Sequence, residues 1–153
     1  EVEKLTNIDR PVDSDNELSY IISGGVSAFE CMVGVEVKKA SHSVGLGICG
    51  QLSYRYYSNP YNDSFLYGLY TGYSSGYHQY EDKKEIDGVK YEDKKGIFAG
   101  VGIGYRWQKP SGWNTTLSMA IHYMEEEYSN VGQPKEKQTS VILFPGITVG
   151  YQF

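Results

Sequence analysis

Apolar and polar residues alternate with a period of two along most of the chain after residue 27. Between residues 113 and 123, for example, Trp113, Leu117 and Ile121 alternate with small or polar residues. This period is typical of β-strands whose two faces meet different surroundings. Six segments share it: 29–38, 44–56, 65–74, 97–107, 113–123 and 144–153. We therefore predict an all-β chain in which these six segments form strands.

Two kinds of connection separate the segments. Residues 58–63 and 108–112 are short connections that combine Pro with Gly or Asn, as tight turns require. Residues 80–96 and 125–137 are long and highly charged. Each apolar stripe covers about 9 to 13 residues, which is enough for a tilted strand to cross a bilayer. Short turns at one end and long loops at the other favour an antiparallel up-and-down transmembrane β-barrel.

Aromatic residues gather on the apolar face at the short-turn end of the predicted strands. Rings at this level fit an aromatic girdle, in which the apolar ring meets lipid and the hydroxyl or indole N–H meets head groups. The predicted girdle comprises Tyr54, Tyr56, Phe65, Tyr67, Tyr105, Trp107, Trp113, Tyr151 and Phe153.

Composition narrows the class further. The net charge is −5, and acidic and basic residues are interspersed along the chain. The chain has no basic patch, so we expect no nucleic-acid partner. The chain contains no run of about 18 apolar residues, so we predict no membrane-spanning helix. Residues 1–16 are charged and lack a regular period, so we expect a polar N-terminal arm or plug, followed by a barrel over residues 17–153. Because the chain begins at Glu1, we expect it to be processed.

The alternation also fits a water-soluble barrel that turns its bulky residues inward around a ligand. The opposite face decides between the two, because it is rich in glycine, including Gly68, Gly100, Gly102 and Gly104. Glycine on an exposed strand face loses packing, whereas inside a narrow barrel it relieves crowding and permits curvature. We therefore expect bulky residues to face lipid and glycines to face the lumen.

These features resemble the small outer-membrane barrels of Gram-negative bacteria, such as the transmembrane domain of OmpA. The terminal "VGYQF" is similar to the aromatic-terminated last strand that the barrel assembly machinery reads. The resemblance implies eight strands, location in the outer membrane, and contact with the bilayer and lipopolysaccharide. We expect no cofactor. Since six strands are clear, we expect residues 1–26 to supply two more, with "LSYIISGGV" (18–26) as one. The alternatives are an arm that fills the lumen, or strands shared between protomers.

Several charged residues fall on the predicted lumen face. Buried charges are costly unless paired, so we expect them to pair and plug the lumen. We place Glu30, Arg55 and Arg106 toward the short-turn end, and Glu36, Lys38, His78 and His122 toward the loop end. The predicted role is structural or interactive, through the loops and with a possible envelope partner. A narrow channel or a subunit of a larger envelope complex remains an alternative.

A lipid-modifying enzyme is the other alternative. Its candidate groups are His42 with Ser43, and His122 with Glu126. Outer-membrane lipid A deacylases carry a His-x-Ser-Asn motif, which the stretch "AIHYMEEEYSN" breaks, so no catalytic residue is carried over. No metal-ligand spacing is present, and we expect the glutamates at 125–127 to form a solvated loop base rather than a cation site.

Two local features complete the predictions. Asp87-Gly88 predicts a hairpin turn within the charged connection, with Glu81 opposite Lys94 and a bulge between this ribbon and the barrel. Cys31 and Cys49 fall on opposite faces if their segments pair around the "KKASHS" turn, so we expect two isolated thiols.

Overall fold

The computed structural model describes residues 17–153 except 28, 30, 61, 77–83, 87–88, 92, 130–131 and 133, and only the backbone of residues 31–32, 74–76, 84–86, 89–91 and 93–94. Within these described residues, no helix is long and apolar enough to cross a membrane. The strands are β1 (Leu18–Val26), β2 (Cys31–Lys39), β3 (His42–Gly47), β4 (Gln51–Tyr57), β5 (Ser64–Gly76), β6 (Lys84–Ile86), β7 (Val89–Tyr91), β8 (Asp93–Gln108), β9 (Trp113–Ser129) and β10 (Glu136–Gln152).

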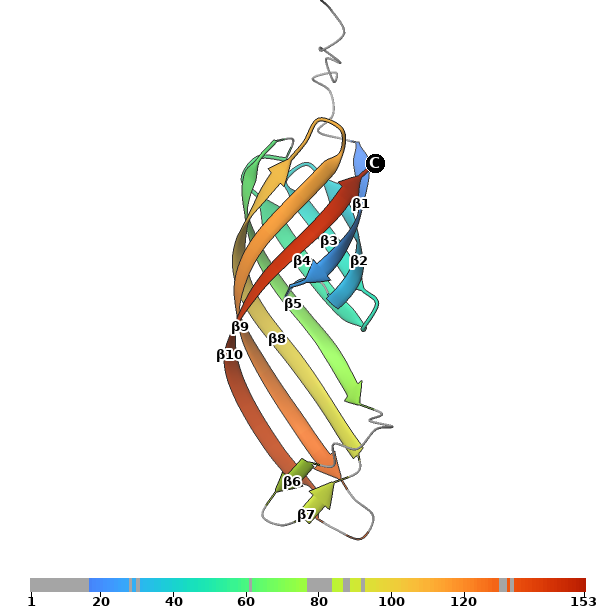
Figure 1. Ribbon diagram of the computed structural model, residues 1–153, viewed down its shortest axis with the longest axis vertical. Helices are drawn as coiled ribbons and strands as arrows, with labels where there is room; N and C mark the ends of the chain where they lie inside the picture. Colours follow the sequence, from blue (N-terminus) through green and yellow to red (C-terminus); the bar gives the residue numbers. More distant parts are fainter. Residues whose placement is uncertain are drawn as a thin grey trace, which may run out of the picture.

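Eight of these strands form a closed barrel in the order β1-β10-β9-β8-β5-β4-β3-β2 (Figure 1). All eight ladders are antiparallel. Each strand pairs with its neighbours in sequence, β6 and β7 being an excursion between β5 and β8, and β10 closes the barrel against β1. The predicted eight-stranded, antiparallel up-and-down barrel is confirmed.

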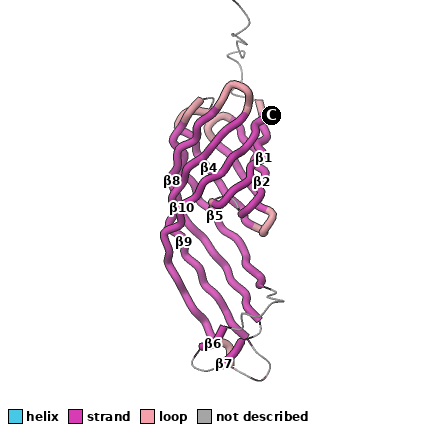
Figure 2. The backbone as a smooth tube through the Cα atoms, in the orientation of Figure 1, coloured by secondary structure: helices cyan, strands magenta, loops and turns pink. Residues whose placement is uncertain are grey.

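The two ends of the barrel differ. The short-turn end carries the connections 40–41, 58–63 and 109–112 and the C-terminus. The loop end carries the connections 27–30 and 48–50 and the two long ones, 77–92 and 130–135. The strands β5, β8, β9 and β10 have 13, 16, 17 and 17 residues, whereas β1 to β4 have 9, 9, 6 and 7. The long strands therefore project past the short ones at the loop end, where the small β6–β7 sheet also lies (Figures 1 and 2).

The two strands missing from the sequence pattern have different origins. One is β1, as predicted from "LSYIISGGV". The other lies inside the segment 44–56, which is two strands, β3 and β4, joined by a turn at 48–50. Val44 pairs with Tyr54 and Leu46 with Leu52, so apolar residues keep the same parity on both sides of the turn. Alternation alone therefore could not reveal the turn, and the prediction of two strands within 1–26 is wrong.

The expectation of isolated thiols is also wrong, because Cys49 is disulfide-bonded and the described residues include no free cysteine. The parity argument holds only inside a ladder. Cys49 lies in the 48–50 turn, where the Gly50 N–H donates to the Gly47 carbonyl at 3.1 Å. Gly50 has a φ of 79°, which glycine adopts without strain. A residue in such a turn does not follow the strand alternation.

The hairpin predicted from Asp87-Gly88 is present as the β6–β7 sheet, in which Ile86 pairs with Val89. This ladder is out of register with the barrel, because Gly76 pairs with Lys94 whereas Lys84 pairs with Tyr91. The predicted pairing of Glu81 with Lys94 is wrong, because Lys94 pairs with Gly76 and Tyr128 in the barrel ladders. The predicted bulge falls on residues outside the described part of the chain.

Candidate functional site

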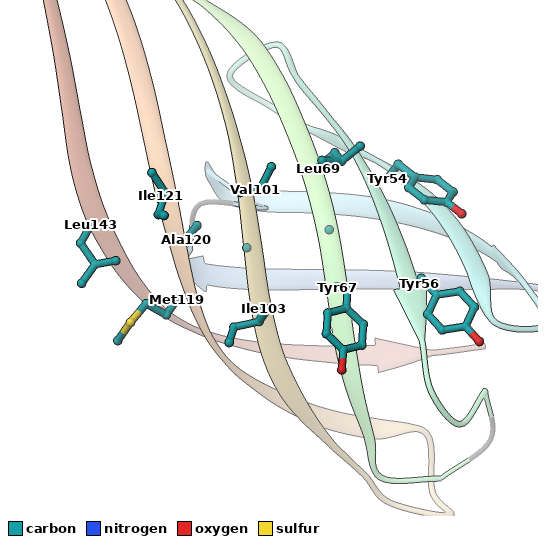
Figure 3. Close-up of a pocket in the computed structure, with 12 residues that line it drawn as sticks. Tyr54, Tyr56, Tyr67, Leu69, Val101, Ile103, Met119, Ala120, Ile121 and Leu143 are labelled. Carbon is teal, nitrogen blue, oxygen red and sulfur yellow. The ribbon is translucent and has the colours of Figure 1, made fainter.

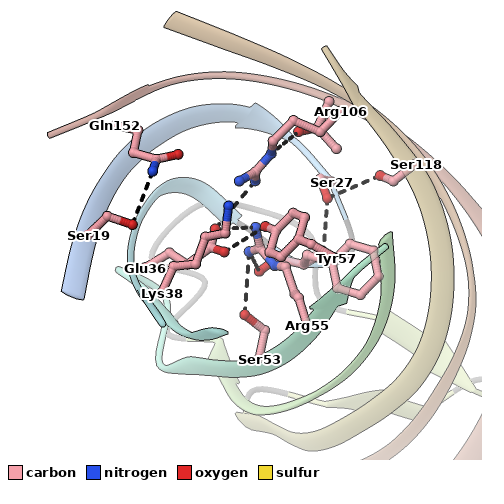
Figure 4. A network of polar contacts seen from close by, with 12 residues as sticks. Ser19, Ser27, Glu36, Lys38, Ser53, Arg55, Tyr57, Arg106, Ser118 and Gln152 are labelled. Carbon is pink, nitrogen blue, oxygen red and sulfur yellow. Dashed lines mark hydrogen bonds and ion pairs between the residues drawn. The ribbon is translucent and has the colours of Figure 1, made fainter. Parts of the chain in front are cut away.

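The interior of the barrel near the short-turn end holds a cluster of charges centred on Glu36 (Figure 4). The Glu36 side chain is 1% exposed and reaches inward from β2. Its Oε2 atom lies 2.9 Å from Nη1 of Arg55 on β4 and 3.3 Å from Nη2 of Arg106 on β8. The Arg106 Nε also donates to the Thr116 hydroxyl at 2.9 Å. One carboxylate therefore links three strands across the lumen.

Tyr57 and Lys38 complete this cluster. The Tyr57 hydroxyl donates to Oε1 of Glu36 at 2.6 Å, and its ring is fully buried. The Arg106 guanidinium lies 4.7 Å from the Tyr57 ring centroid and the Lys38 ammonium 4.8 Å, within the range of cation–π contacts. Lys38 also donates to the Pro60 carbonyl in the 58–63 turn. Three cations and one carboxylate thus share a small space, with an aromatic ring among them.

An aromatic layer lies next to the charges, toward the loop end. The His122 Nδ1 and the Tyr70 hydroxyl are 3.0 Å apart, and the two rings stack at 5.6 Å. Phe98 stacks on His122 at 5.2 Å, and Phe29 meets Tyr70 edge-on at 5.6 Å. Phe144 lies 6.2 Å from the His122 ring. These rings come from four strands and one connection, and together with the charges they fill the lumen.

Glycines on β5 and β8 make room for these rings. A Cβ at Gly68 would overlap the Phe29 ring, one at Gly72 would overlap Phe98, and one at Gly100 would overlap the Tyr70 hydroxyl. The lumen-facing glycines are therefore required by packing, as the sequence indicated. Phe29 is the exception to the predicted faces. The pattern placed it outward, but it lies in the β1–β2 connection, folds into the lumen and is 2% exposed.

The structure brings together most of the predicted lumen residues. Arg55, Arg106, Glu36 and Lys38 form the charged cluster, and His122 belongs to the aromatic layer. Glu36 and Lys38 lie toward the short-turn end, so their predicted place near the loops is wrong. The error arose because segment 44–56 was taken as one strand. Two strands in its place give β2 the opposite direction along the barrel. The side chains of Glu30 and His78 fall outside the described residues. Sequence reasoning missed Tyr57, Tyr70 and Phe98 as site residues. The signal was their parity with lumen-facing residues of the same strands: Arg55, Gly68 and Gly100.

The glutamates at the loop end do not converge on one point. Glu125 and Glu127 face outward near Lys137 and Lys135, at 3.9 and 2.9 Å. Glu126 accepts a hydrogen bond from Tyr128 at 2.7 Å. The hydrogen bond from Lys135 lowers the pKa of Glu127. Within the part of the chain that the structure describes, no group of three acidic, His or Cys side chains could hold a metal ion.

The candidate catalytic pairs are not assembled. His42 and Ser43 are adjacent in β3, so they face opposite sides: Ser43 is buried in the lumen, and the exposed His42 Nδ1 lies 2.7 Å from the Tyr54 hydroxyl. His122 contacts Tyr70, and Glu126 contacts Tyr128. In neither pair does a base engage the proposed partner, which general acid–base or nucleophilic catalysis requires.

The outer wall is apolar over the whole barrel. Val101, Ile103 and Leu117, for example, are 52%, 60% and 52% exposed. All nine aromatics predicted for the girdle lie on this outer face near the short-turn end, and several contact each other across strands. Phe65 and Tyr105 are 5.0 Å apart, and Trp113 and Tyr151 are 5.3 Å apart. Tyr20 on β1, 49% exposed, joins them and was not predicted.

A groove of about 550 Å³ crosses this wall over β4, β5, β8, β9 and β10 (Figure 3). Its floor includes the backbone of Gly68, Gly102 and Ala120, three residues whose side-chain positions point into the lumen. Apolar side chains and three tyrosines form its sides: Tyr54, Tyr56, Tyr67, Leu69, Val101, Ile103, Met119, Ile121 and Leu143.

Comparison of the chain with family models, with curated proteins and with solved structures finds no match. The fold and the side-chain geometry therefore carry the functional argument.

Proposed function

We propose that this chain is a small outer-membrane barrel of a Gram-negative cell that acts as a structural or interaction protein, with a filled lumen and with the loop end as its contact surface. One observation carries the proposal. Charged Glu36, Arg55 and Arg106 are buried inside the barrel, while large apolar side chains cover its outside. A water-soluble barrel would bury the apolar face instead, because its exposure to water is unfavourable.

The filled lumen favours a scaffold over a channel. Ion-paired side chains near the short-turn end and stacked rings above them occupy the space through which ions would pass. Lipid and lipopolysaccharide are the partners of the outer wall, and the C-terminal strand is the segment for the barrel assembly machinery. The loop ends of β9 and β10 carry Glu125, Glu127 and Lys137, and offer polar surface to an envelope partner.

Labelling with a membrane-impermeant amine reagent tests the location and orientation. In intact cells, the reagent should modify Lys135 at the loop end but not Lys109 in the 109–112 turn, and permeabilised cells should show both modified. Labelling of Lys109 alone would reverse the orientation. Recovery of the folded chain from the soluble fraction would contradict the proposal. Planar-bilayer recordings should show no conductance; a steady conductance would replace the scaffold with a channel.

A further inference from the structure

The groove on the outer wall has a polar extension at the short-turn end. Lys39 pairs with His42 across β2 and β3, and His42 pairs with Tyr56 across β3 and β4. Tyr56 in turn pairs with Tyr67, and Tyr67 with Ile103. This row of neighbouring positions leads from two basic side chains, through two tyrosines, into the apolar groove.

The basic end of the row is exposed, and its histidine ring is held in one orientation by contacts with two tyrosines. Lys39 and His42 both lie on the outer face. The His42 ring stacks on Tyr54 at 6.1 Å and meets Tyr56 edge-on at 5.4 Å. Because its Nδ1 contacts the Tyr54 hydroxyl, Nε2 is the atom that an incoming anionic group would meet. A lysine ammonium beside it adds a point charge of the kind that binds phosphate.

The groove also follows the path of a lipid chain. Tyr56 precedes the last residue of β4, so this end of the groove lies at the level of the girdle. Met119 and Leu143 lie near the middle of β9 and β10, so the other end lies deep in the apolar belt. The groove therefore rises from the head-group level toward the bilayer centre, and its volume falls in the usual range for a small-molecule site.

From these observations we propose that the outer wall holds one glycerophospholipid of the periplasmic leaflet. Its phosphate contacts Lys39 and His42, the tyrosine hydroxyls lie near its ester groups, and an acyl chain occupies the groove. The assignment to the periplasmic leaflet rests on the proposed function, in which the short-turn end faces the periplasm.

Native mass spectrometry of the detergent-purified protein, with added phosphatidylglycerol, tests the site. The unmodified chain should retain one phospholipid. The double variant Lys39→Gln/His42→Gln should reduce the retained fraction roughly tenfold, since it removes charge-assisted contacts. Ile103→Trp should reduce it by filling the groove. The matched controls Lys109→Gln and Ile147→Trp alter the same residue types elsewhere on the outside, and should retain lipid normally.

Retention that is unchanged in the double variant and in Ile103→Trp would overturn the proposal, as would equal losses in the controls. A site that keeps lipid A in place of phosphatidylglycerol would also overturn it. Each variant is checked on a gel for the shift between unheated and boiled protein. If the unmodified chain folds in membranes but keeps no phospholipid, only this inference fails, whereas failure to enter membranes contradicts the proposed function.

Discussion

Glu36 is the residue on which the charged part of the lumen depends. Its two carboxylate oxygens accept bonds from Arg55, Arg106 and Tyr57, and the site is closed to water. Removing one partner of a buried ion pair leaves the other charge uncompensated, which costs far more than an exposed pair contributes. Here two guanidinium groups would be left without their carboxylate.

We therefore expect Glu36→Ala to lower the free energy of unfolding by about 3–5 kcal/mol. Urea unfolding in lipid vesicles, followed by tryptophan fluorescence, measures the change. Glu125→Gln is the control, because its partner Lys137 lies 3.9 Å away at the surface; this variant should change stability by less than about 1 kcal/mol. Equal stability of Glu36→Ala and the unmodified chain would show that the cluster does not hold the barrel together.

The contact between Gly68 and Phe29 gives a second expectation. The three atoms nearest to a Cβ at Gly68 all belong to the Phe29 ring. Gly68→Ala should therefore destabilise the barrel by about 1–3 kcal/mol through crowding, and Phe29→Ala by about 3–5 kcal/mol through the lost ring. The double variant should cost less than the sum of the two by at least about 1 kcal/mol, measured by a double-mutant cycle. Strict additivity would mean that Phe29 does not occupy the lumen beside Gly68.

At the scale of strands, alternation predicted which face each residue occupies better than it predicted where strands end. Val44, Leu46, Leu52 and Tyr54 all face outward as expected, although a turn separates the first two from the last two. Because the 48–50 turn has three residues, apolar residues keep even numbers on both sides of it. Only the glycines at the turn, Gly47 and Gly50, could therefore reveal it. The error had one consequence for the site, because it reversed β2 and moved Glu36 to the wrong end.

The sequence predicted that the buried lumen charges pair with one another, but it did not predict which residues form each pair. Glu36 meets Arg106, which lies 70 residues away in sequence, because β2 and β8 face each other across the barrel. Such a contact depends on the register of every ladder between the two strands. Phe29 was assigned to the wrong face for a different reason: it belongs to a connection, where the strand period does not apply.

The face assignment of β8 has its own test in Val101, which lies in the middle of the strand and is 52% exposed. Val101→Lys should cost about 2–4 kcal/mol, because it places a charge near the bilayer midplane. Thr139→Lys is the control, since Thr139 pairs with Glu125 beyond the apolar part of the wall. Urea unfolding in vesicles compares the two variants. A harmless lysine at position 101 would mean that this face does not meet hydrocarbon.

At the scale of the whole molecule, the barrel is inverted relative to a water-soluble protein. Its ion pairs and polar side chains are enclosed, and its valines, leucines and aromatics are exposed. Closure of β10 on β1 leaves no open sheet edge at the short-turn end, where both strands are paired. This closure matters in a membrane, because unpaired backbone groups are costly in hydrocarbon. This arrangement supports the proposal that an apolar medium surrounds the barrel.

The two tryptophans of the chain, Trp107 and Trp113, test this claim without any substitution. Both lie on the outer face at the short-turn end and are 45% and 54% exposed. Their fluorescence is measured after reconstitution into vesicles whose lipids carry bromine near the carbonyl end or near the middle of the acyl chain. Strong quenching, greatest for bromine near the carbonyl end, is the expected result. Fluorescence that is the same in brominated and unbrominated vesicles would contradict the account.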